Sequence, residues 1–396
     1  MSAATVSRWA RRFLLASAAA LVLALGADLA GLPRRTVVVL ALYGFVLHAL
    51  FGKAYSLVPS YFDRRLAVPR APAVHLPFAL VGVAGLALDP LDGVPPLVGT
   101  VGAVAWAVGV GAFLAALGWT LRDNPAGSET GTGEANAERR PVDRFANAFV
   151  PVVLAYLALG SYETLAAGVG LPTVLGPYLP RASHLLGAGT AALLVFAVGF
   201  RLLPRFLVAH PPRAVVAVVL PAGAVAPVLL AASIARRGTL FRVGAALEAV
   251  AVVGFALVVA VMFVHSDRRR VGFYGVLAGV LAGVLAVAVG LWLAFGDAGG
   301  SLVAAHLRLT LFGFLGLLVV GVTYQFYPPA IGTSPGIDDR TALVALGALA
   351  GGLALTAASL LVGRPALADA GTAVSLAGGL LHLYLLSALF VERYPR

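Results

Sequence analysis

Twelve long apolar runs dominate the sequence, and each is long enough to cross a lipid bilayer as a helix. A bilayer admits only helices or closed barrels, and these runs lack the period-2 alternation of barrel strands. We therefore predict an all-α polytopic membrane protein, with residues 1–396 forming a single transmembrane domain. The expected spans are 13–31, 36–60, 73–90, 96–121, 146–170, 182–208, 213–235, 240–265, 271–295, 301–328, 341–363 and 367–391.

The composition excludes several function classes. Hydrophobic residues make up 60% of the chain and charged residues only 11%, far from the balance of a soluble enzyme. The chain has no cysteine, so disulfides, thiolate catalysis and Cys-ligated zinc or iron–sulfur sites are all excluded. The length of the first apolar run favours a retained helix over a cleaved signal peptide.

The basic residues predict the orientation of the chain. The net charge is +11, but the 28 basic residues are scattered between apolar runs, which argues against a nucleic-acid surface. With twelve spans, 19 of them fall on the side of both termini and 7 on the opposite side. The positive-inside rule then predicts cytoplasmic N- and C-termini. We expect the chain in the plasma membrane. The one long polar stretch, 122–145, is expected to be a flexible cytoplasmic loop.

An internal repeat relates the second, sixth and tenth spans. The segments GFVLHALFGKAYSLVP, GTAALLVFAVGFRLLP and GFLGLLVVGVTYQFYP align without gaps from Gly44, Gly189 and Gly313. The identical positions of the first and third segments include Gly44/Gly313, Gly52/Gly321, Tyr55/Tyr324 and Pro59/Pro328. Close helix packing through glycine explains any single match. Three matching helices spaced four spans apart favour a threefold repeat, and repeats in membrane proteins commonly converge on a functional site.

Three histidines embedded in these repeated spans are the candidate ligands. His184 and His306 are expected at similar depth in the outer third of the membrane, and His48 lies nearer the centre. Neutral imidazole tolerates burial and is a common nitrogen ligand for haem iron or copper. An interhelical hydrogen bond from each ring is the alternative interpretation.

The remaining ionisable groups in or near the spans are four charged residues, which would be the sites of a transporter, and four further histidines. The embedded charges are Lys53, Glu163, Glu248 and Arg308, each costly in hydrocarbon unless paired or hydrated. Similar depth favours an ion pair between Glu248 and Arg308, whereas Lys53 can snorkel toward the cytoplasm. Three further histidines are expected to be solvated at the cytoplasmic interface, namely His75, His210 and His265. A fourth, His382, lies in the last span without an obvious partner.

The stretch AAHLRLTLFGFLGLLVVGVTYQFYPPAIG, from Ala304 to Gly332, resembles the tenth helix of subunit I of the haem-copper oxidase superfamily. The twelve spans and threefold repeat resemble the same family, including its looser NnrS-like branch associated with nitric oxide stress. The resemblance implies that His306 is an axial haem ligand, with Arg308 available to haem propionates. The family's low-spin haem ligands fall on Val37 and Arg308. His184 stands at the first copper-ligand helix, but the seventh span has no histidine.

Two kinds of function follow from these patterns. The first is a divergent haem-copper-oxidase-like protein with one haem, held by His306 and with His184 or His48 as a sixth ligand, and without copper. It would bind nitric oxide or oxygen, or pass electrons from a donor. The second is a cofactor-free transporter, or else a structural or assembly subunit, in which every histidine is packed. The sequence assigns no catalytic residue to either.

Overall fold

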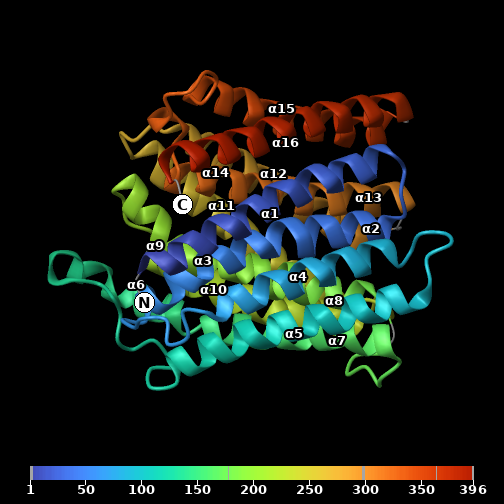
Figure 1. Ribbon diagram of the computed structural model, residues 1–396. Helices are drawn as coiled ribbons and strands as arrows, with labels where there is room; N and C mark the ends of the chain where they lie inside the picture. Colours follow the sequence, from blue (N-terminus) through green and yellow to red (C-terminus); the bar gives the residue numbers. More distant parts are fainter. Residues whose placement is uncertain (1–2, 177, 297–298, 363, 395–396) are drawn as a thin grey trace. The chain divides into compact units, whose positions relative to one another are not determined.

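The computed structural model describes residues 3–176, 178–296, 299–362 and 364–394, and every regular element among them is helical. Twelve of these helices, some built from consecutive elements, are long and apolar enough to cross a membrane, which confirms the predicted multi-pass, all-α fold (Figure 1). The last residue of the predicted span 341–363 and the terminal Arg396 lie outside the described residues.

In chain order the elements are α1 (Ala3–Leu29), α2 (Arg34–Val38), η1 (Val39–Leu47), α3 (His48–Tyr61), α4 (Ala71–Leu88), α5 (Pro96–Leu121), η2 (Glu134–Arg139), α6 (Arg140–Asn147), α7 (Val150–Val169), α8 (Pro180–His184), η3 (Leu185–Ala192), α9 (Leu193–Leu207), α10 (Arg213–Ser233), α11 (Thr239–Val264), α12 (Val271–Phe295), α13 (Gly300–Arg308), η4 (Leu309–Leu317), α14 (Leu318–Phe326), η5 (Pro329–Ile331), α15 (Asp339–Val362) and α16 (Pro365–Arg393).

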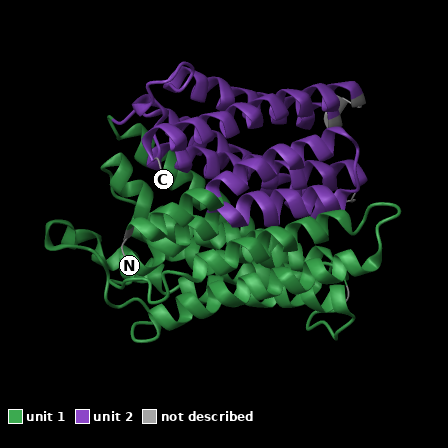
Figure 2. Cartoon of the chain, in the orientation of Figure 1, with its two compact units in different colours: residues 1–13, 50–267 green, residues 14–49, 268–396 purple. Residues whose placement is uncertain are grey.

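The chain forms two compact units (Figure 2). Unit 1 comprises Met1–Phe13 and Leu50–Asp267, and unit 2 comprises Leu14–Ala49 and Arg268–Arg396. Two of the boundaries fall inside the apolar helices α1 and α3. No polar linker or change in composition marks those two boundaries, so the sequence predicts no such division.

The three repeated spans share an interruption of the α-helix. Each contains a π-helical segment, η1, η3 or η4, and each segment includes the repeated glycine Gly44, Gly189 or Gly313. A π-helix bonds each amide to the carbonyl five residues earlier, so it widens the helix and is frequently found at functional sites. These three spans are also the most deeply buried of the twelve. The shared π-helix is a second, structural correspondence between the repeated segments.

Small residues pack each repeated span against the first span of its own group of four. A Cβ added at Gly52 would lie 2.7 Å from Phe13 Cβ on α1. At the matching Gly321, an added Cβ would lie 2.6 Å from the Gly272 carbonyl oxygen on α12. Both contacts are too short for any larger residue without movement. Glycine packing and the repeat are therefore two descriptions of one arrangement.

Three helical hairpins complete the groups of four. Extensive packing joins α4 to α5 and α10 to α11 in unit 1, and α15 to α16 in unit 2, where the last two run side by side in Figure 1. Glycines again meet at close range, as between Gly85 and Gly102 in the first hairpin. Asp338 caps the start of α15, because its side chain accepts a 2.8 Å bond from the Thr341 amide. That backbone bond lowers the pKa of Asp338 below its ordinary value.

The polar stretch 122–145 differs in part from the loop predicted over it. Helix α6 begins at Arg140, six residues before the predicted span, with Pro141 in its first turn. Earlier in the stretch, the Asn124 side chain donates to the carbonyl oxygens of Phe62 and Glu129. Arg64 forms a 2.6 Å ion pair with Glu129. Hydrogen bonds thus tie this stretch to the end of the second span within unit 1.

Candidate functional site

A histidine stands beside each of the three π-helical segments. His48 directly follows η1, His184 directly precedes η3, and His306 lies three residues before η4. In all three residues, Nδ1 is hydrogen-bonded to a backbone carbonyl oxygen. A carbonyl oxygen only accepts, so each Nδ1 must carry the proton, and in the neutral ring Nε2 holds the lone pair. This is the tautomer in which imidazole serves as an Nε2 ligand.

His306 is oriented by the neighbouring helix. Its Nδ1 donates a 3.0 Å hydrogen bond to the carbonyl oxygen of Ala286 on α12. One turn further along α12, a Cβ added at Gly290 would lie only 3.2 Å from His306 Cε1. Glycine at position 290 therefore leaves the space that the imidazole uses. The ring is half-buried and fixed by a helix other than its own.

His48 and His184 differ from His306 because each bonds to its own helix. His48 is fully buried, and its Nδ1 lies 2.8 Å from the carbonyl oxygen of Tyr43, five residues earlier. His184 is half-buried and bonds at 2.8 Å to the carbonyl oxygen of Pro180 in its first turn. Bonds of this kind fix the ring against its own helix, and neither His48 nor His184 gains an anchor on another span through Nδ1.

The embedded charges are paired differently from the prediction. The expected Glu248–Arg308 pair is wrong, because Arg308 forms a bidentate ion pair with Asp28, at 2.7 and 3.0 Å. Similar depth could not identify the partner, which also depends on how each helix is rotated about its axis. The ion pair uses Nε and Nη2 of Arg308, and the role of Arg308 with haem propionates stays a prediction.

Two further acidic groups have contrasting surroundings. Glu163, a buried embedded charge, accepts hydrogen bonds from the amides of Val174 and Leu175 at 2.8 and 3.1 Å. It organises the connection that follows its own span. Glu248 on α11 has a buried carboxylate oxygen, Oε2, without a hydrogen-bond partner among the described residues. Lys53 is half-buried.

Two buried tyrosine–histidine pairs were missed by the sequence analysis. In unit 1, Tyr55 Oη and His75 Nδ1 are 3.1 Å apart. In unit 2, Tyr324 Oη and His382 Nδ1 are 3.0 Å apart. Both histidines are almost completely buried, so the solvated position predicted for His75 is wrong, whereas His210 and His265 are exposed as predicted. The matching tyrosines of the repeat were the available signal.

Aromatic packing explains why His75 leaves the interface. Its ring centroid lies 4.6 Å from that of Phe51, 5.1 Å from Phe13 and 5.5 Å from Phe113. These rings come from spans 1, 2 and 4 and enclose a residue only four positions into α4. In the second repeat, Phe200 occupies the position of Tyr55 and Tyr324. It packs edge-on against Phe255, with ring centroids 5.4 Å apart, and has no hydroxyl group.

A charged network closes the arginine-rich end of unit 1. Asp143 on α6 accepts from Arg205 Nη2 at 2.6 Å, and its other oxygen lies 3.3 Å from Arg201 Nε. Arg201 also donates to the carbonyl oxygen of Tyr61 and stacks over the Tyr61 ring, 4.0 Å from its centroid. Arg201 and Asp143 are almost completely buried. A buried charge needs such partners, and here they come from α3, α6 and α9.

The described residues contain no group of three or more His, Asp or Glu side chains that could hold a metal ion. A single axial haem ligand requires only one such side chain. The Nδ1 of His306 is bonded to the Ala286 carbonyl oxygen, so its Nε2 holds the lone pair, and Gly290 lies beside the ring.

Comparisons with known proteins do not place the chain in a family. No protein-family model matches it, and no curated protein is significantly similar to it.

Proposed function

We propose that this chain is a plasma-membrane haem protein that holds one haem through His306 and interacts with a diatomic gas, nitric oxide or oxygen, or passes electrons. The observation that carries the proposal is the placement of a histidine beside each π-helical segment of the repeated spans. Among the three, His306 is half-buried and anchored by a second helix. The 19-to-7 distribution of basic residues supports cytoplasmic termini.

Two residues of α12 orient His306 in such a site. Ala286 fixes the tautomer and the ring plane of His306, and Gly290 leaves room for that plane. When bound, a haem with one imidazole ligand supplies an open coordination position at which a diatomic gas can bind. The hydrophobic surroundings of the spans limit the access of water and thereby affect the redox potential.

The test is an absorption spectrum with a pyridine haemochrome assay. The full chain is purified in detergent from a haem-replete host, together with His306→Ala and His48→Ala. We expect about one haem per chain in the wild type and in His48→Ala, and loss of the Soret band in His306→Ala. A folded, monodisperse wild-type protein without haem would contradict the proposal.

Glu248 favours a second candidate, a transporter that moves protons or cations. Its buried Oε2 lacks a hydrogen-bond partner among the described residues, and embedded carboxylates commonly mark ion pathways. Glu163 is the matched control, because it is also a buried carboxylate but accepts two backbone hydrogen bonds. In proteoliposomes with a trapped pH dye, this candidate predicts proton flux that Glu248→Gln abolishes and Glu163→Gln retains. Absence of flux in the wild type would remove it.

A further inference from the structure

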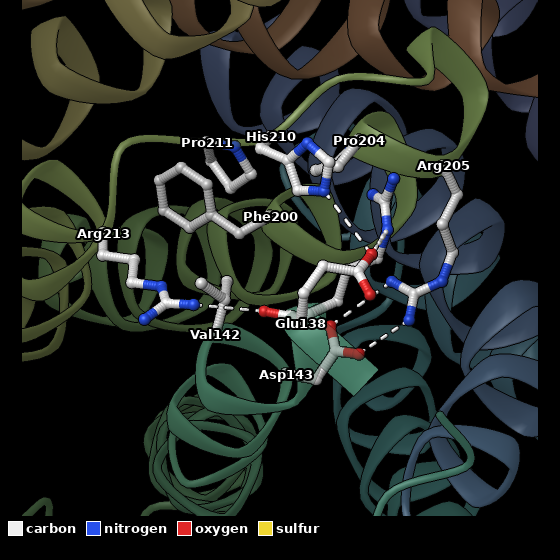
Figure 3. A pocket seen from close by; sticks show the side chains of 10 residues that line it. Glu138, Val142, Asp143, Phe200, Pro204, Arg205, His210, Pro211 and Arg213 are labelled. Atoms are coloured by element: carbon white, nitrogen blue, oxygen red, sulfur yellow. Dashed lines mark hydrogen bonds and ion pairs between the residues drawn. The ribbon is translucent and has the colours of Figure 1, made fainter. Parts of the chain in front are cut away.

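A cavity of about 260 Å³ opens at the arginine-rich end of unit 1 (Figure 3). Its lining comes from η2, α6, α9 and the start of α10. The positive-inside distribution of the sequence predicts that this end is cytoplasmic. The cavity is therefore expected at the depth where lipid headgroups and soluble anions both reach a membrane protein.

Cationic groups outnumber acidic ones around this cavity. Its ten lining residues include three arginines and one histidine but only two carboxylates: Arg139, Arg205, Arg213 and His210 against Glu138 and Asp143. Asp143 is shared between Arg205 and the adjacent Arg201, so two guanidinium groups face one carboxylate. The local balance remains positive even with His210 neutral.

Two of the arginines retain hydrogen-bonding capacity. Arg213 donates through Nη2 to the backbone carbonyl oxygen of Glu138 at 3.2 Å, and this bond does not neutralise its charge. Arg139 is 11% exposed and donates through Nη1 to the Ala209 carbonyl oxygen. Its buried Nε makes no hydrogen bond among the described residues and lies 3.4 Å from Glu138 Oε1 as an ion pair. Guanidinium groups with unused donors suit the tetrahedral oxygens of phosphate.

The walls and the size of the cavity further restrict the class of ligand that it can bind. Val142, Phe200, Pro204 and Pro211 line it beside the charged groups, and an apolar wall strengthens electrostatic attraction. Its volume lies below the roughly 300–1,000 Å³ of sites for drug-sized molecules. A phosphate group therefore fits it better than a whole nucleotide.

We propose that this cavity binds a phosphate group, carried either by an anionic phospholipid headgroup or by free phosphate. Basic pockets on the cytoplasmic side of membrane proteins commonly bind such headgroups. The proposal is independent of the haem proposal, because its residues all belong to unit 1 and include no histidine of the repeated spans.

The test compares the full chain with Arg213→Gln, Arg139→Gln and the charge-retaining Arg213→Lys. Arg236→Gln is the matched control, because Arg236 is an exposed arginine of unit 1 outside the cavity. One arm measures equilibrium binding of radiolabelled inorganic phosphate in a neutral detergent. The other measures lipid retention by native mass spectrometry after reconstitution in phosphatidylcholine with or without phosphatidylglycerol.

We expect binding in at least one arm, weakened about tenfold by Arg213→Gln and by Arg139→Gln and unchanged by Arg236→Gln. Arg213→Lys should retain more binding than Arg213→Gln, because it keeps the charge but not the planar donors. Binding of inorganic phosphate identifies a soluble ligand, whereas selective retention of phosphatidylglycerol identifies a lipid. The proposal is overturned if neither probe binds, or if the two glutamine variants bind as well as Arg236→Gln.

Discussion

Asp143 in unit 1 and Asp28 in unit 2 each pair with an arginine, but the two pairs differ in their exposure. Asp143 and Arg201 are 1% and 2% exposed, whereas Asp28 and Arg308 are 11% and 26% exposed. The first pair is enclosed, and Arg201 also donates a hydrogen bond to the carbonyl oxygen of Tyr61. The second pair is partly exposed, and its arginine lies two residues after His306. We expect the enclosed polar groups of unit 1 to maintain the fold, whereas the less enclosed groups lie on or beside α13, where we propose that His306 holds a ligand.

The largest expected effect follows from breaking the enclosed pair. Asp143→Asn leaves the buried Arg201 without its carboxylate and should lower the free energy of unfolding by about 3–5 kcal/mol. Asp28→Asn removes the partner of the less enclosed Arg308 and should lower the free energy of unfolding by less than Asp143→Asn does. Unfolding midpoints in detergent measure the difference. Equal shifts for the two variants would contradict the distinction drawn between the pairs.

The tyrosines of the repeat test whether enclosed polar groups stabilise the fold. Tyr55→Phe and Tyr324→Phe each remove the hydroxyl bonded to a buried histidine, and each should cost about 1–3 kcal/mol. The reverse change, Phe200→Tyr, introduces a hydroxyl group among aromatic rings and should cost a similar amount. Thermal unfolding of the three variants is the measurement. A stabilising Phe200→Tyr would mean that the second repeat also holds a polar partner.

The smallest effect on stability is expected at Gly290, with a larger effect on the spectrum. In Gly290→Ala the added Cβ meets His306 Cε1 at 3.2 Å, so the imidazole must move by a few tenths of an ångström. We expect a shifted Soret band with an unfolding free energy changed by less than about 1 kcal/mol. Gly347→Ala is the control, because its added Cβ has no heavy atom within 4 Å, and it should leave the spectrum unchanged. Identical spectra for Gly290→Ala and Gly347→Ala would contradict the proposal that the orientation of His306 affects a bound haem.

Hydropathy was sufficient to predict the twelve spans, because burial in lipid imposes long apolar runs directly on the sequence. The ungapped repeat also anticipated which spans share the π-helical segments. It could not predict the π-helix itself, since the added residue per turn leaves no distinct residue pattern in these segments.

Side-chain partners were less predictable than spans. His75 follows Arg70 and Pro72 closely, so its position in the chain indicated the interface, but rings from three other spans enclose it. Arg308 was assigned to Glu248 on depth alone, although Asp28, at the end of the first span, forms the pair. These outcomes depend on helix rotation and on contacts distant in the chain, which periodicity in a single span does not determine.

The most direct test of the central claim is chemical rescue of His306→Gly. The variant and the wild type are purified from a haem-replete host, and their spectra are recorded with and without added imidazole. If His306 is the axial ligand, the Soret band is lost or shifted in the variant and restored by imidazole, which fills the space that the side chain leaves. A wild-type Soret band retained in the variant without imidazole, or no haem in either protein, would contradict the account.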